Sequence, residues 1–128
     1  MPSTATATAP TVAAQEHALN AQVLQGKILD AFERFYAEEV VMQENAGTPT
    51  VGKAANRERE RQFVASIAQF HHAALLGSAV EGDRSFSEWV MDVTFQGGVR
   101  VKLEQVAVRQ WRDGLVVSER FYYNAATA

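Results

Sequence analysis

Residues 86–123 read FSEWVMDVTF-QGG-VRVKLEQVAVRQW-RDG-LVVSERFYY. They form three runs rich in β-branched and aromatic residues, separated by two short turns that contain glycine. Such turns between alternating runs are typical of β-hairpins. A fourth run, residues 69–80, precedes the turn Glu81-Gly82-Asp83. The C-terminal half of the chain therefore predicts a four-strand antiparallel meander.

The N-terminal half has a helical period instead. Apolar side chains recur at three- and four-residue spacings between Val12 and Phe35, as one buried helix face requires. Gly26 interrupts this pattern and predicts a break between two helices. The elements expected between this break and the meander are a second helix over 27–37, a strand over 39–44, a turn-rich segment over 45–49 and a third helix over 53–67.

This order of elements predicts the fold class. Three N-terminal helices followed by strands indicate an α+β domain, with the helices packed on a strongly curved, mostly antiparallel sheet. Such a sheet facing helices forms a cone-shaped pocket, the usual ligand site in folds of this kind. We expect residues 12–128 to form this single domain and residues 1–11, a charge-free segment of Ala, Thr, Ser and Pro, to be a disordered leader. The leader lacks the basic start and apolar centre of a secretory signal, so a cytoplasmic location is expected.

Composition excludes several kinds of function. The 128 residues carry 12 basic and 15 acidic side chains, and the net charge of −3 argues against nucleic-acid binding. The sequence has no cysteine, which excludes disulfides, thiolate nucleophiles and cysteine-ligated metals. No apolar run approaches the length of a membrane span, and Gly97-Gly98 is typical of a hairpin turn rather than of a phosphate-binding loop. We therefore expect no cofactor, no metal site and no membrane partner.

Four segments carry a family resemblance: FYAEEVV at 35–41, TVGK at 50–53, WRDGLV at 111–116 and ERFYY at 119–123. Through them the chain resembles the SnoaL-like family of the nuclear transport factor 2-like superfamily, which includes ketosteroid isomerase. The resemblance covers about residues 15–124 and implies the cone-shaped fold and a small-molecule pocket. It leaves the function open, because this superfamily contains isomerases, cyclases, epoxide hydrolases and non-catalytic binding modules.

The catalytic positions of ketosteroid isomerase carry over only in part. Its general-base carboxylate falls on Glu44, or on Gln43 when the count starts from Gly52. Its oxyanion-hole tyrosine falls near Leu19 and its oxyanion-hole acid near Ala107, and neither side chain can donate a hydrogen bond. The resemblance therefore implies the pocket but not the ketosteroid isomerase reaction.

Alternation along the strands sorts the candidate residues into a pocket face and an outer face. Glu44 shares a face with Met42, so it would be an acid at the end of an apolar row, where desolvation would prepare it to exchange protons near neutral pH. The alternative is a glutamate exposed at the strand end or paired with an arginine of the third helix. Glu119 is a second candidate acid, and its alternative is a buried ion pair with Arg109. His71 is a candidate proton shuttle, and its alternative is a core or surface histidine.

The candidate catalytic residues are therefore Glu44, Glu119 and His71. The candidate ligand-binding residues are Met42, Trp89, Met91, Gln105, Phe121 and Tyr123. Gln105 is included because a buried amide needs hydrogen-bond partners, and a ligand could provide one. The neighbouring His71 and His72 point to opposite faces of a strand and cannot share a metal. The charge run at 57–61 is interpreted as a solvated helix face with short-range ion pairs.

Three functions stay open at this point. The first is a cofactor-free acid–base enzyme on a small, mostly apolar substrate, with Glu44 as the base. The second is a non-catalytic protein that binds such a ligand, and the third is an association module. We also expect a homodimer, because the outer positions of the meander are more apolar than a solvated sheet face normally is. These outer positions are Val90, Val106, Val108 and Tyr122.

Overall fold

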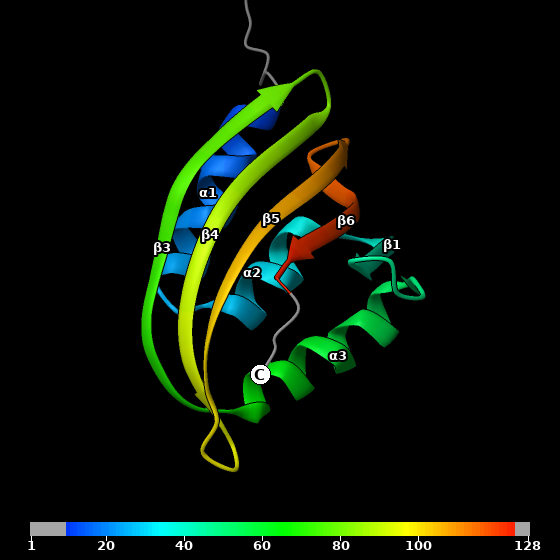
Figure 1. Cartoon of the computed structure of the whole chain (residues 1–128). Coiled ribbons are helices and arrows are strands. Elements are labelled where there is room, and N and C mark those ends of the chain that lie inside the picture. The colour runs from blue at the N-terminus through cyan, green and yellow to red at the C-terminus, as the bar shows by residue number, and fades with distance from the viewer. Residues whose placement is uncertain (1–9, 125–128) are drawn as a thin grey trace, which may run out of the picture.

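A computed structural model describes residues 10–124 (Figure 1). In chain order the elements are α1 (Val12–Leu24), α2 (Ile28–Phe35), β1 (Tyr36–Glu44), β2 (Thr50–Val51), α3 (Lys53–Ser66), β3 (Ile67–Glu81), β4 (Arg84–Phe95), β5 (Arg100–Arg112) and β6 (Leu115–Tyr123). The expected leader lies outside the described residues, apart from Pro10 and Thr11. Thr11 caps α1, because its hydroxyl oxygen accepts a hydrogen bond from the backbone N–H of Ala14 at 3.0 Å.

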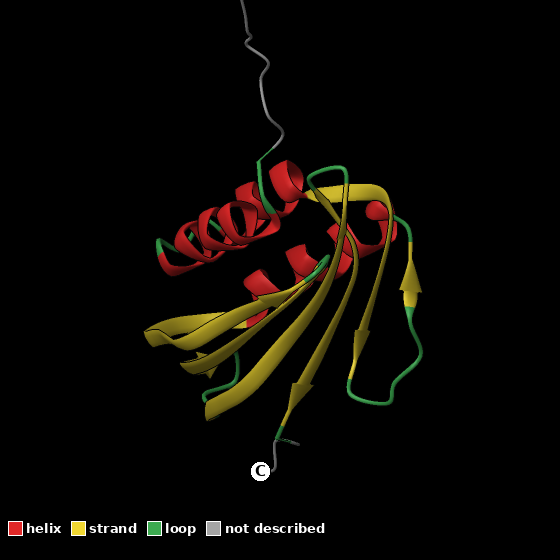
Figure 2. Ribbon diagram, turned by 90° about the horizontal axis from the view of Figure 1, so that it is seen from above, coloured by secondary structure: helices red, strands yellow, loops and turns green. Residues whose placement is uncertain are grey.

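The strands of the described residues form one curved sheet in the order β2-β1-β6-β5-β4-β3. Strands β3 to β6 pair antiparallel in sequence order, as the predicted meander requires. Strand β1 pairs antiparallel with β2 and parallel with β6, so the sheet is mixed but mostly antiparallel. The helices lie on the inner side of the curve (Figure 2). The predicted α+β architecture is confirmed.

The last hairpin fixes the register of the two strands that supply the buried Arg109 and Glu119. Asp113 and Gly114 both have positive φ angles, 53° and 79°, as a two-residue turn between twisted strands requires. This turn, together with a bulge after Gln110, places Arg109 of β5 directly opposite Glu119 of β6. Both side chains therefore lie on the same face of the sheet.

The boundary between α2 and β1 differs from the prediction. Strand β1 begins at Tyr36, whereas the helical pattern predicted a helix that continued to residue 37 and a strand from residue 39. Tertiary pairing explains the difference, because Tyr36 has an extended backbone and aligns with Val116 of β6. The local helical period is overridden by this contact with a distant strand.

Two smaller differences concern the ends of α3. The helix stops at Ser66, one residue earlier than predicted, and β3 starts at once because Ile67 pairs with Phe95 of β4. Before the helix, Thr50 and Val51 form the two-residue strand β2, which pairs with β1. The sequence predicted no strand here, but a turn that leads into the third helix. Both changes lengthen the sheet around the third helix.

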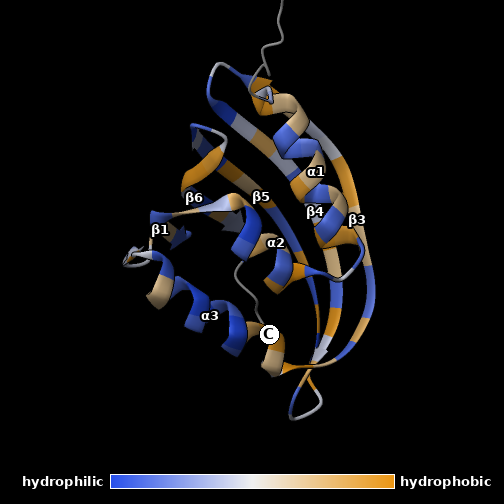
Figure 3. Cartoon of the chain, turned by 180° about the vertical axis from the view of Figure 1, so that it is seen from behind, coloured by the Kyte–Doolittle hydropathy of each residue, from blue (hydrophilic) through white to orange (hydrophobic). Residues whose placement is uncertain are grey.

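The main core lies between α1, α2, β1 and β6. Its members include Leu19, Phe32, Phe35 and Val40, each at most 2% exposed. Helix α1 also packs against β3 and β4, whereas α3 packs against β1 and β2. Helix α3 is mostly hydrophilic, in contrast to the orange stripes of the sheet (Figure 3). Within residues 10–124 no helix is long and apolar enough to cross a membrane.

Candidate functional site

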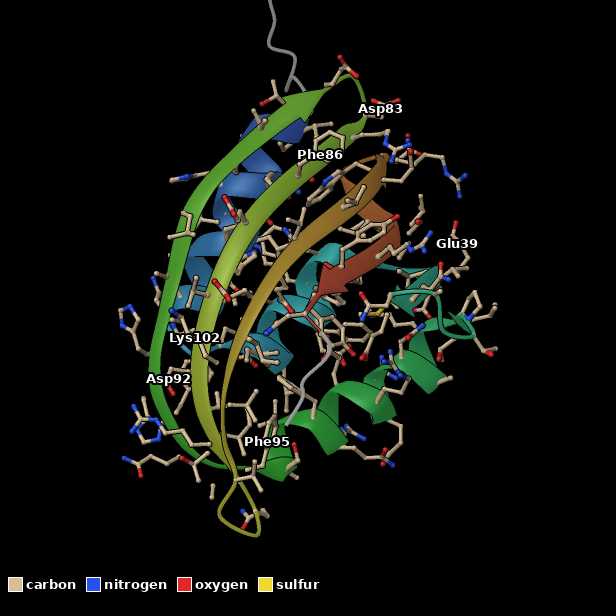
Figure 4. The ribbon with its side chains drawn as sticks, in the orientation of Figure 1. Glu39, Asp83, Phe86, Asp92, Phe95 and Lys102 are labelled. Atoms are coloured by element: carbon tan, nitrogen blue, oxygen red, sulfur yellow. The ribbon has the colours of Figure 1, made fainter. Side chains whose placement is uncertain are left out.

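A cavity of about 350 Å³ lies between the helices and the concave face of the sheet. Its wall contains side chains from all three helices and from β1, β4, β5 and β6. The volume is at the lower end of the range for small-molecule sites. Most of the lining is apolar, and it includes Phe95, which lies near the C-terminal end of α3 in Figure 4. The cavity is therefore suited to one small, mostly apolar molecule.

The structure brings most of the sequence-predicted residues together at this cavity. All six candidate ligand-binding residues line it, and so does Glu44. Strand alternation is the reason, because each of these residues has the parity of its strand's inner face. On β5 the face that lines the cavity carries Gln105 and Arg109. Their roles as ligand contacts stay predictions.

Glu119 lies behind the wall of the cavity, in a buried ion pair with Arg109. The distance between Arg109 Nε and Glu119 Oε2 is 2.6 Å, and both residues are at most 3% exposed. The hydroxyl of Tyr36 donates a hydrogen bond to the same carboxylate oxygen at 2.6 Å. Burial, together with the nearby Glu119 charge, raises the pKa of Tyr36 well above its ordinary value. The buried ion pair between Glu119 and Arg109, which was the alternative to a catalytic role for Glu119, is therefore present.

Helix α1 supplies a second carboxylate to this cluster. Glu16, only 2% exposed, accepts hydrogen bonds from Nη1 of Arg109 at 3.0 and 3.1 Å. The same Nη1 also bonds to Asn20 at 2.8 Å. Burial alone would lower the pKa of Arg109, but the oxygens of Tyr36, Glu119 and Glu16 outweigh it and raise the pKa. The guanidinium is therefore held between two buried carboxylates.

Glu16 was not among the residues predicted for the site, although its spacing in the sequence indicates a buried position. Glu16 follows Val12 by four residues and precedes Leu19 by three, so it lies on the buried face of α1. A charged residue at a core position of a helical period indicates a buried partner. Ser85 and Trp111 complete the hydrogen-bond chain: the Ser85 hydroxyl donates to Glu16 at 2.7 Å and accepts from Trp111 Nε1 at 2.8 Å.

Glu44 lies at the rim of the cavity rather than in its interior. Its side chain is 45% exposed and forms an ion pair with Arg59 of α3. The hydroxyl of Tyr123 donates a hydrogen bond to the other oxygen of Glu44 at 2.7 Å. This bond, with partial burial, raises the pKa of Tyr123 to about 12. Glu44 thus lines the cavity. It is also paired with an arginine of the third helix, which was the alternative to a free acid in the cavity.

The carboxyl group with the most unusual environment is Glu60 of α3. Glu60 is half-buried, lines the cavity, and has neither a hydrogen bond nor an ion pair with any residue in 10–124. Desolvation raises its pKa to about 7, and the Glu119 and Glu44 charges act in the same direction. Arg59 and Arg109 oppose this shift without cancelling it. Glu60 is therefore a carboxyl that exchanges protons near neutral pH.

Sequence analysis missed Glu60 because it lies in the run Arg57-Glu58-Arg59-Glu60-Arg61, which was interpreted as a solvated face. The helical period separates the members of this run. Glu60 shares a face with Asn56, four residues earlier, and with Phe63, three residues later. Asn56 is fully buried and Phe63 lines the cavity. The alternating charges of the run therefore hid the fact that two of its residues, Arg59 and Glu60, line the cavity.

His71 does not line the cavity. Its Nε2 lies 2.7 Å from the hydroxyl of Thr94, on the outer side of β4. Asp92 shares this outer side and is labelled there in Figure 4. His72 is exposed. Neither histidine is therefore placed to move a proton within the cavity. Across residues 10–124, no three His, Asp or Glu side chains gather as metal ligands.

A family comparison agrees with this geometry. The sequence profile of the SnoaL-like domain matches residues 7–123. The chain belongs to the SnoaL-like family. Among curated proteins, none matches it in sequence. The resemblance found from the sequence alone is confirmed.

Several solved structures share the fold of this chain. A Mesorhizobium loti protein described as a SnoaL-like polyketide cyclase is 26% identical, with a TM-score of 0.80 over 89% of this chain and 100% of that one. A Catenulispora acidiphila protein with a ketosteroid isomerase-like fold, solved with trimethylamine, is 17% identical, with a TM-score of 0.72 over 92% and 88%. An epoxide hydrolase of the LEH-like type from M. tuberculosis is 18% identical, with a TM-score of 0.69 over 88% and 81%. The SnoaL-like chain thus shares its fold with these three solved proteins.

Proposed function

We propose that the protein binds a small, mostly apolar molecule in the cavity and moves a proton on it by general acid–base catalysis, without a cofactor. The observation that carries this proposal is Glu60, a desolvated carboxyl with a pKa of about 7 in an apolar cavity. A general base works best when its pKa is close to the working pH. Glu60 takes the place of Glu44, whose carboxylate is already paired with Arg59.

The reaction class that suits this arrangement is proton transfer next to a carbonyl group. The Glu60 carboxylate takes a proton from the carbon beside the carbonyl, and the C–H electron pair moves into a new carbon–carbon double bond. The carbonyl oxygen then holds the negative charge, until the Glu60 carboxylic acid returns its proton to carbon. Arg109 lines the cavity and bonds through Nε and Nη1, so its Nη2 is the donor proposed for that oxygen.

Relatives support a small-molecule reaction in this fold. The Mesorhizobium protein is described as a cyclase and the M. tuberculosis protein as an epoxide hydrolase. Trimethylamine in the Catenulispora protein supports a ligand of small size. A second candidate, ligand binding without catalysis, is favoured by one observation. Tyr36, Glu119 and Arg109 already bond to one another, as a purely structural cluster would.

The test is hydrogen–deuterium exchange at the carbon next to the carbonyl in a panel of small cyclic and aryl ketones, followed by NMR in D₂O. We expect exchange to be accelerated for at least one ketone, and the rate to rise with pH through about 7 as Glu60 ionises. Glu60→Gln should remove the acceleration. Glu58→Gln is the matched control, since Glu58 lies on the exposed side of the same helix.

Three other results would change the proposal. Saturable binding of ketones with exchange at the buffer rate would favour the non-catalytic candidate. Loss of exchange in Glu44→Gln but not in Glu60→Gln would return the base to Glu44. The absence of both ketone binding and accelerated exchange would refute the small-molecule function. The homodimer and the cytoplasmic location stay predictions from the sequence.

A further inference from the structure

The charges around the cavity are unequal in sign. Four carboxyl groups lie in its wall or directly behind it: Glu16, Glu44, Glu60 and Glu119. Among residues 10–124, two cations face them, Arg59 and Arg109. Within the described part of the chain, carboxyl groups therefore outnumber cations at the cavity by four to two.

Both arginines are already engaged by other carboxylates. Arg59 is paired with Glu44, and Arg109 is held by Glu16 and Glu119 together. Glu60 has no cationic partner of its own among residues 10–124. A desolvated carboxylate without a partner favours either a proton or a cation beside it. A bound molecule can supply that cation.

The rest of the wall suits the apolar part of a cationic molecule. Seven aromatic side chains line the cavity: Phe32, Tyr36, Phe63, Trp89, Phe95, Phe121 and Tyr123. Aromatic faces attract cations through their π electrons, more strongly where water is excluded. They also contact the hydrocarbon part of a ligand by dispersion. Aromatic walls beside one unpartnered carboxylate match a small organic amine.

We propose that the ligand of this cavity carries a positively charged ammonium group, which pairs with Glu60 while its apolar part contacts the aromatic wall. This inference names a substrate class and rests on the proposed function of the cavity. It is also compatible with the proton transfer at Glu60. A carboxylate has two oxygens, so one can accept the ammonium N–H while the other faces the reacting carbon. A nearby positive charge also stabilises the carbanion that forms.

The test compares three molecules of nearly equal shape and different charge: benzylamine, benzyl alcohol and benzoate. Binding to the full chain is measured by NMR titration at pH 8 and pH 6. At pH 8 we expect benzylamine to bind roughly tenfold more tightly than benzyl alcohol, the ratio that one charge-assisted hydrogen bond gives. Benzoate should bind the most weakly. At pH 6 the preference for the amine should shrink, because Glu60 is then largely protonated.

The pH effect has to be separated from the other charged groups that face Glu60. These groups are Glu44 and Tyr36 of β1, Arg109 of β5, Glu119 of β6 and Arg59 of its own helix. Glu60→Gln therefore serves as the direct test: it should bind amine and alcohol equally at both pH values. Glu58→Gln should keep the preference for the amine. Circular dichroism of each variant confirms that it is folded.

Equal binding of amine and alcohol by the unchanged protein at pH 8 would overturn the inference. An undiminished preference in Glu60→Gln would do so as well, because the amine would then be held elsewhere. Failure of all three molecules to bind would also count against it. These results are distinguishable from failure of the proposed function, which is judged by ketone exchange and does not depend on the charge of the ligand.

Discussion

Replacement of Glu60 by Gln should stabilise the protein at and above neutral pH. The pKa of Glu60 is about 7 in the folded chain, against an ordinary value of 4.5. The folded state therefore holds a proton that the unfolded state has already lost between these two pH values. The contribution of protonated Glu60 to the free energy of unfolding is therefore fully present below about pH 4.5. It is lost as the pH rises to about 7.

The size of the loss follows from the shift. A change of one pKa unit corresponds to about 1.4 kcal/mol, so the full shift would be worth about 3 kcal/mol. Glu60 is half-buried, and water screens part of this energy. We expect the Glu60→Gln variant to exceed the unchanged protein by about 2 kcal/mol at pH 8 and to equal it at pH 4.5. Gln keeps the size of the side chain and has no charge to desolvate.

The assay is urea unfolding of both proteins at half-unit steps from pH 4.5 to pH 8. The quantity of interest is the difference between the two free energies of unfolding, because groups such as Asp92 titrate alike in both proteins and cancel. The Asp92–Arg100 ion pair lowers the pKa of Asp92, so its contribution lies at lower pH. A flat difference curve, or a Glu60→Gln variant that is less stable at pH 8, would refute the assignment of Glu60 as a desolvated acid. Glu58→Gln, on the exposed side of the same helix, is the matched control.

Further predictions concern stability and assembly. Arg109→Met should lower the free energy of unfolding by about 3–5 kcal/mol in urea, because Glu16 and Glu119 lose their shared cation; a loss below about 1 kcal/mol would mean that the cluster is hydrated. Thr11→Ala should cost about 1 kcal/mol by thermal unfolding, since the cap of α1 is lost; an unchanged melting temperature would show that the helix end frays. The outer sheet face, where Tyr122 is 44% exposed, should form a homodimer, and a monomeric mass by sedimentation at micromolar concentration would contradict this.

The fold could be predicted from the sequence because its determinants are local. The turns at 96–98 and 112–114 contain glycines with positive φ, and alternation assigns the inner faces of the strands. Alternation has a period of two, so one known inner residue fixes a whole strand. This is why Met42, Trp89 and Phe121, which line the cavity, could be assigned to the inner face from the sequence. Tyr36 was assigned to a helix instead, because only its pairing with Val116 of a distant strand decides its conformation.

The acid of the site could not be chosen by the same means. Glu44 and Glu60 each follow a pattern that faces the cavity, one by strand alternation and one by helical period. What separates them is the position of α3 across the rim. It brings Arg59 to Glu44 and leaves Glu60 at the cavity without a hydrogen-bond or ion-pair partner among residues 10–124. That position depends on contacts between α3 and β1, which no single segment of the sequence encodes.

The buried cluster connects the stability of the fold with the chemistry of the cavity. Arg109 brings one positive charge and Glu16 and Glu119 two negative ones, so the cluster has one excess negative charge in a region that water does not reach. Glu119 is also the largest charged contributor to the raised pKa of Glu60. The Glu119 carboxylate, which holds Arg109 in the buried cluster, therefore also raises the affinity of Glu60 for a proton. If this coupling is correct, Glu119→Gln should move the titration midpoint of Glu60 downward by NMR, whereas a cluster with only a structural role would leave it near 7.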